Sequence, residues 1–75
     1  MFLKVNLNKI TNISEFVAIA SKAIYPVTLS SSLHTVNAKS IMGVFSLDLS
    51  KPLTVEFDDR DAELLVEFNK YKIIE

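Results

Sequence analysis

The stretch VNAKSIMGVFSL, residues 36–47, constrains the fold of this chain more than any other. Ser40 has the side chain that a helix N-cap prefers, and a mostly apolar run follows it. Gly43, the only glycine, interrupts this run, and in a helix it costs about 1 kcal/mol relative to alanine. We therefore expect a short helix over about residues 41–47, with Gly43 packed closely against a neighbouring element. So short a helix cannot bury every apolar side chain, so some should face a partner.

Alternating apolar side chains predict strands before and after this helix. Residues 2–7 and 53–57 repeat with a period of two, which is typical of a half-buried strand. Residues 27–30 and 35–38 are shorter candidates. A turn around Ser31 joins them, so we expect the two to form an antiparallel hairpin.

Two further segments have the periodicity of a helix. The first spans about residues 13–25, with Asn12 or Ser14 as its N-cap and with Pro26 ending it. The second begins with the acidic run 58–61, whose negative charges suit the positive end of a helix dipole. The side chains expected to face the core are Ile13, Phe16, Val17, Ala20 and Ile24 in the first helix, and Ala62, Leu65, Val66 and Phe68 in the second.

The predicted order of elements is β-α-β-β-α-β-α. Strands and helices that alternate in so short a chain favour an α+β fold in two layers. We expect an open-faced β-sandwich, in which helices cover one face of a four-stranded, mostly antiparallel sheet. Residues 1–75 are enough for one domain and are expected to form a single one.

Composition excludes several classes of function. The chain has no cysteine and one histidine, which argues against a disulfide framework, a thiolate nucleophile and a structural zinc site. A net charge of −1 without a basic run argues against nucleic acid as a partner. No apolar run reaches the ~20 residues that span a bilayer, and the alternating N-terminus lacks the order of a signal peptide. We therefore expect a cytoplasmic protein with no metal, no cofactor and no membrane insertion.

The central half of the chain resembles a known family. Residues 20–57 correspond without a gap to HPr, the phosphocarrier protein of the bacterial sugar phosphotransferase system. The resemblance rests on ASK at 20–22, VN at 36–37 and KSIMGV at 39–44, placed between a hairpin and a strand. It implies the open-faced sandwich described above, and a protein of sugar transport that is not itself an enzyme.

The first site of the HPr family is a histidine that accepts phosphate from phosphoenolpyruvate. It stands at the start of the first helix, in a motif of the type Gly-Ile-His-Ala-Arg-Pro-Ala. The ungapped register places Lys9 at that position, and residues 6–15 contain no His, Arg, Gly or Pro. A register set on the first strands implies a shorter loop with the same result. Because a protonated ammonium cannot replace imidazole as the nucleophile, we expect no histidine phosphocarrier activity and no catalytic residue.

The second site of the family is a regulatory serine, which matches Ser40. In Gram-positive relatives an HPr kinase phosphorylates it, and the product signals catabolite repression through a transcription factor. A phosphate there would meet free N–H groups and the positive end of the helix dipole. The apolar patch through which the family docks its partners matches Ile41, Met42, Phe45 and Leu47.

The resemblance therefore implies a regulatory module that binds proteins and is switched by phosphorylation of Ser40. Its implied partners are an HPr kinase, a transcriptional regulator or components of the phosphotransferase system. We expect a monomer or a weak homodimer.

Two other functions stay open. The chain could be a phosphocarrier with an atypical nucleophile, for which His34 in the hairpin is the only candidate. It could also be a purely structural domain that dimerises through the apolar patch. Each residue has a plainer explanation as well: Ser40 as an N-cap, Met42 and Phe45 as core, and His34 as an exposed turn residue. The carboxylates of Asp58, Asp59 and Asp61 are expected to be a solvated helix start and not a cation site.

Overall fold

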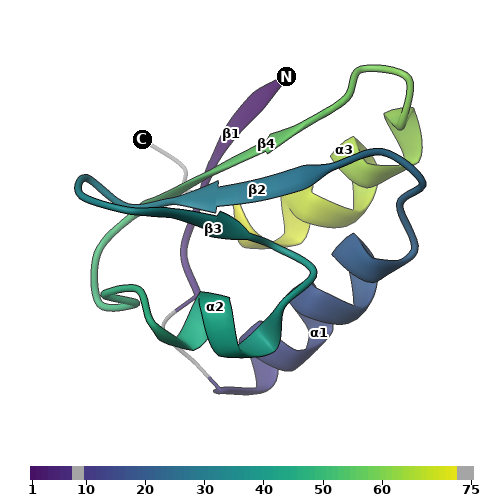
Figure 1. Cartoon of the computed structure of the whole chain (residues 1–75). Coiled ribbons are helices and arrows are strands. Elements are labelled where there is room, and N and C mark those ends of the chain that lie inside the picture. Colours follow the sequence, from purple (N-terminus) through teal and green to yellow (C-terminus); the bar gives the residue numbers. More distant parts are fainter. Residues whose placement is uncertain (8–9, 73–75) are drawn as a thin grey trace.

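The computed structural model describes residues 1–7 and 10–72. The elements are β1 (Phe2–Val5), α1 (Ile10–Ser21), β2 (Val27–Ser30), β3 (Thr35–Asn37), α2 (Ile41–Phe45), β4 (Leu53–Phe57), α3 (Ala62–Phe68) and a short 3₁₀-helix, η1 (Asn69–Tyr71) (Figure 1). The predicted order of strands and helices is confirmed. Among the described residues, no helix combines the length and the apolar character needed to cross a membrane.

The strands form one sheet in the order β1-β4-β2-β3, and each pairing between neighbours is antiparallel. Leu3, Val55, Leu29 and Val36 lie opposite one another in successive strands. Figure 1 shows the helices gathered on one face of this sheet. The predicted α+β open-faced sandwich is therefore confirmed, and its sheet is antiparallel throughout.

The core fills the space between the sheet and the helices. The strands bury Val5, Val27, Leu29, Leu53, Val55 and Phe57, as alternation predicted. Phe68 of α3 stacks on Phe16 of α1, with ring centroids 4.9 Å apart, and meets Phe57 of β4 edge-on at 5.4 Å. Each such side chain contributes roughly 1.5–3 kcal/mol by its burial, so these three rings are a main link between the layers.

Tyr71 closes the core at the end of the described chain. Its ring packs edge-on against Phe16, with 6.0 Å between centroids, and its hydroxyl donates a hydrogen bond to Oε2 of Glu15 at 3.0 Å. Burial, reinforced by that hydrogen bond to a carboxylate, raises the pKa of Tyr71 to about 12.

The predicted start of α1 is wrong by about one turn. The helix begins at Ile10, so Asn12 and Ser14 lie inside it and neither is its N-cap. Ile13 and Phe16 are buried as predicted, so the extra turn at the start of α1 leaves these two core positions unchanged.

The predicted end of α1 is also wrong. The helix stops at Ser21, and tighter bonds close it, from Lys22 N to the Ile19 oxygen and from Ala23 N to the Ala20 oxygen. Ile24 consequently lies beyond the helix and is 83% exposed, although helical spacing placed it in the core. Pro26 restricts the backbone only of the residue directly before it, and the chain has already left the helix several residues earlier.

The last helix starts later than predicted, and its buried face also differs from the predicted one. Residues 58–61 form a turn, in which Asp61 N donates to the Asp58 oxygen, and α3 begins at Ala62. Phe68 is buried as expected and Leu65 is partly buried, but the second buried residue of α3 is Leu64. Ala62 and Val66 are exposed, against the prediction, because each lies two residues before a buried residue and therefore on the opposite side of the helix.

Candidate functional site

Ser40 stands at the start of α2 with its side chain in the solvent. Its backbone is extended, with φ −102° and ψ 111°, and its Oγ accepts a hydrogen bond from Gly43 N at 3.2 Å. The predicted N-cap is therefore confirmed, and the residue is exposed. An exposed hydroxyl on a capped helix is open to an enzyme that approaches from solvent.

Contacts with β3 and with the segment after α1 hold the residues that precede Ser40. The backbone N–H of Ser40 donates to the Asn37 oxygen at 3.0 Å, and Lys39 N donates to Oδ1 of Asn37 at 2.9 Å. Lys39 also reaches the segment just after α1, where its Nζ donates to the Ala23 oxygen at 2.8 Å. These bonds place Ser40 relative to both layers, and sequence reasoning missed the one from Lys39 because it joins distant segments.

The apolar residues after Ser40 divide between two faces. Val44 is fully buried against the core, whereas Ile41, Met42 and Phe45 are 41%, 78% and 45% exposed. These three are the exposed members of the expected apolar surface, and from here on the name apolar patch refers to them alone. The expectation that α2 leaves apolar side chains uncovered is confirmed, and Met42 and Phe45 are not core residues.

Leu47 does not belong to this surface. It was expected to lie in the apolar patch, but only 5% of it is exposed. The helix ends at Phe45 and Ser46 forms the C-cap, so the chain turns and directs Leu47 into the core.

Gly43 of α2 packs beside Val36 of β3. A Cβ built on Gly43 would lie 3.4 Å from Val36 Cβ and 3.5 Å from Ser40 Cβ. These are contact distances, so the expected close packing is present. Gly43 therefore lies close to β3, and the space beside it could still hold one methyl group.

Two residues were considered for phosphoryl transfer by the histidine route, Lys9 and His34, and both are separate from Ser40 in the sequence. Lys9, which the ungapped register places at the family histidine, lies outside the described residues. His34 is exposed in the β2–β3 turn, where its backbone N–H donates to Oγ of Ser31 at 3.1 Å. It lines an open cavity of about 480 Å³ together with Ser46 and Lys51. The expectation of an exposed turn histidine is confirmed.

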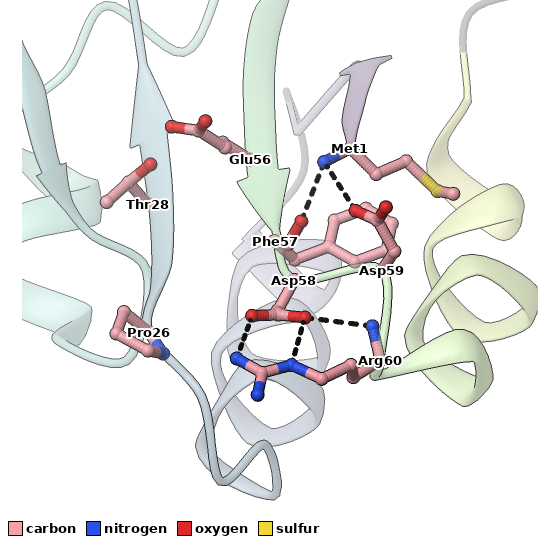
Figure 2. A pocket seen from close by; sticks show the side chains of 8 residues that line it. All are labelled: Met1, Pro26, Thr28, Glu56, Phe57, Asp58, Asp59 and Arg60. Atoms are coloured by element: carbon pink, nitrogen blue, oxygen red, sulfur yellow. Dashed lines mark hydrogen bonds and ion pairs between the residues drawn. The ribbon is translucent and has the colours of Figure 1, made fainter.

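A second cavity, of about 550 Å³, lies at the end of β4, away from α2 (Figures 1 and 2). There the Arg60 guanidinium binds Asp58 through two bonds of 2.9 and 2.7 Å, and it lies 4.0 Å from the ring centroid of Tyr25. These hydrogen bonds hold the pKa of the Asp58 carboxyl well below its usual range.

Asp58 and Asp59 of the acidic run have different partners. Figure 2 shows Asp59 turned toward the amino group of Met1, away from the pair formed by Asp58 and Arg60. Across the described part of the chain, no three His, Cys, Asp or Glu side chains gather as a metal site. Arg60 stands among these acidic residues in the sequence, and this is the signal that could have predicted its ion pair with Asp58.

Comparison with known proteins identifies the family. A family model described as "PTS HPr component phosphorylation site" matches residues 10–68. The structure is similar to the crystal structure of a phosphocarrier protein HPr from Bacillus anthracis str. Ames, with a TM-score of 0.74 and 25% identity over 96% of this chain and 94% of that one. It is also similar to HPr-C-His from Thermoanaerobacter tengcongensis, with a TM-score of 0.70 and 27% identity over 89% and 88% of the two chains. No curated protein sequence gives a significant match. Since the family model covers well over half of its length, this chain belongs to the HPr family of the phosphotransferase system, whose members are phosphocarriers and not enzymes.

Proposed function

We propose that this chain is a regulatory member of the HPr family that binds proteins through the apolar patch and lacks histidine phosphocarrier activity. It acts as one HPr-like domain over residues 1–75, in the cytoplasm. The observation that carries the proposal is the exposed Ser40 beside three exposed apolar side chains of α2. Its partners are an HPr kinase and a transcriptional regulator or a component of the phosphotransferase system.

Phosphorylation of Ser40 is the proposed switch. The Oγ of Ser40 already accepts the N–H of Gly43, and a phosphate oxygen can take over that acceptor role. The modification adds about −1.5 to −2 charges while α2 keeps its cap. Because Ile41 and Met42 follow immediately, this charge arrives at the edge of the apolar patch and changes which surfaces can dock there.

The apolar patch supports docking by its shape and composition. Ile41 and Phe45 are one helical turn apart, and Met42 beside them is flexible enough to adapt to different partners. Val44 anchors the helix from its buried side. The patch therefore presents exposed apolar area on a rigid support, which favours association with another protein.

The absence of the family histidine supports the loss of carrier activity. Residues 6–15 contain no imidazole, and the single histidine, His34, is in the β2–β3 turn. The nucleophile that the family uses is thus missing from the segment where the family has it.

The decisive experiment is incubation with an HPr kinase and ATP, followed by intact-mass and peptide mass spectrometry. We expect one added phosphate on Ser40 and none in Ser40→Ala. Ser46→Ala, which removes the exposed serine at the other end of α2, is the matched control and should still be modified. An unmodified protein, or modification that persists in Ser40→Ala, contradicts the switch.

The carrier alternative is tested with phosphoenolpyruvate and the first enzyme of the phosphotransferase system. We expect no acid-labile label on the protein. A label that His34→Ala abolishes would instead establish a phosphocarrier with an atypical nucleophile.

A further inference from the structure

The side chain of Lys39 links two segments that are far apart in the chain. Its Nζ donates to the Ala23 oxygen at 2.8 Å, and this bond joins the connection between β3 and α2 to the segment after α1. Lys39 is partly buried beside a groove of about 540 Å³ that Ile24 and Val36 also line. A cation with a fixed position therefore stands directly before Ser40, the serine proposed as the switch.

The acceptor that holds this cation carries no net charge. Lys51, Arg60 and Lys70 each form an ion pair with a carboxylate. Lys39 instead donates to a backbone carbonyl. The attraction between an ammonium and a phosphate dianion adds a Coulomb energy that a neutral carbonyl cannot supply. The ammonium of Lys39 is therefore expected to exchange its present acceptor for a phosphate that comes within its reach.

A phosphate on Ser40 lies within that reach. The Cα atoms of Lys39 and Ser40 are consecutive and hence about 3.8 Å apart, and lysine has a flexible four-carbon stem. Both backbone N–H groups donate to Asn37, at 2.9 Å from Lys39 and 3.0 Å from Ser40. These bonds fix the backbone, so the exchange of acceptor requires only rotation of the Lys39 side chain.

The carbonyl that the ammonium leaves does not stay without a donor. The Ala23 oxygen belongs to the same peptide group as the N–H of Ile24, and Ile24 is 83% exposed. The groove that Ile24 and Lys39 line brings water to this peptide group. A backbone carbonyl that solvent reaches is satisfied by water, so the loss of the Lys39 bond carries only a small penalty.

We propose that Lys39 responds to phosphorylation of Ser40: its ammonium leaves the Ala23 oxygen and binds the phosphate. This inference rests on the proposed function and adds a second consequence to it. The modification then acts in two places, because it brings charge to the edge of the apolar patch and breaks the link between α2 and the segment after α1.

The first test is the amide spectrum of the full chain with phosphoserine incorporated at Ser40 during translation, a route that needs no HPr kinase. We expect the phosphate to shift the amide resonance of Ile24, because that N–H shares a peptide group with the Ala23 oxygen. In Lys39→Met the resonance should already resemble that of the phosphorylated wild type and should hardly move on phosphorylation. An Ile24 amide that does not respond in the wild type, or responds equally in Lys39→Met, overturns the proposal.

The second test observes the phosphate itself. A titration followed by ³¹P chemical shift should give a lower second pKa for the phosphoserine in the wild type than in Lys39→Met, because a neighbouring ammonium favours the dianion. Lys39→Arg keeps the positive charge and should restore the lower pKa. Lys22→Met removes an exposed lysine that lines the cavity between α1 and α3, and as the matched control it should titrate like the wild type. Equal values in the wild type and Lys39→Met contradict the pairing.

The switch and the response of Lys39 fail separately. If an HPr kinase leaves Ser40 unmodified, the proposed switch is wrong, even where an incorporated phosphoserine pairs with Lys39. If the kinase modifies Ser40 and Lys39 stays on the Ala23 oxygen, the present inference is wrong and the switch stands.

Discussion

Gly43 donates its backbone N–H to the Oγ of Ser40, so the serine proposed as the switch is also the cap of α2. Both roles use the same oxygen. Ser40→Ala should therefore lower the free energy of unfolding by about 1 kcal/mol, whereas Ser40→Asp should retain the cap. Urea unfolding followed by circular dichroism measures the difference. Ser32→Ala, in the exposed β2–β3 turn, is the control, and equal stability of the Ser40→Ala and control proteins would contradict the capping role.

Gly43→Ala should stabilise the protein. Alanine gains up to about 1 kcal/mol over glycine inside a helix, and the added methyl group would meet Val36 Cβ at an ordinary contact distance of 3.4 Å. Gly43→Val should be destabilising, because its two further methyl groups would crowd β3. Thermal unfolding of the two variants beside the wild type tests this, and a loss of stability in Gly43→Ala would show that α2 cannot accept even one methyl group.

Met42→Asp should impair docking and spare the fold. Met42 is 78% exposed, so the change in unfolding free energy should stay within about 0.5 kcal/mol. If the apolar patch binds the kinase, the rate of Ser40 phosphorylation at low substrate concentration should fall about tenfold or more. Val66→Asp, at an exposed apolar residue of α3, is the matched control. Equal rates for the two variants would remove the patch from the interaction.

Sedimentation at several concentrations distinguishes docking from self-association. We expect a monomer or a weak dimer whose apparent mass rises only slightly with concentration. Strong association that Met42→Asp abolishes would instead support the structural, dimerising alternative. Val66→Asp again serves as the control.

Deprotonation of Tyr71 should lower the stability of the protein in alkaline solution. Burial, together with the hydrogen bond to Glu15, raises its pKa to about 12, whereas tyrosine in an unfolded chain has a pKa of about 10. The folded protein thus holds this proton more tightly, and the resulting stabilisation is complete below pH ~10 and is lost as the pH rises to ~12. Denaturation at pH 9 and 11.5 should show a smaller decline for Tyr71→Phe than for the wild type. An identical decline would exclude Tyr71 as its source.

Protonation of Asp58 should lower the stability of the protein in acid. Its hydrogen bonds to Arg60 depress its pKa, so the stabilisation is present above the unfolded value of about 3.9 and is lost as the pH falls below it. Thermal unfolding at pH 6 and pH 2.5 should show a smaller acid-induced decrease in Tm for Asp58→Asn than for the wild type. An equal acid-induced decrease in the two proteins would exclude the pair of Asp58 and Arg60 as its source.

Local signals predicted the elements that depend on local physics. The boundaries of β2 and β4 follow from alternation, because successive side chains of a strand point to opposite faces. The N-cap at Ser40 follows from the chemistry of one side chain and the backbone three residues later. The family resemblance is equally local, since it rests on the run around Ser40.

Longer-range packing decided the features that sequence reasoning missed. Phe16 of α1 stacks on Phe68 of α3, and this contact joins two segments that lie far apart in the chain. Leu47 has the same apolar character as Phe45, and only the turn after α2 separates a core residue from a surface residue.

The sequence by itself determined the order of the elements, the capped start of α2 and the missing family histidine, because each is written in neighbouring residues. The tertiary structure alone decided which side of α2 faces solvent and that Leu47 turns into the core. The physical reason is that burial is shared among segments far apart in the chain, and no local pattern contains the geometry that brings them together.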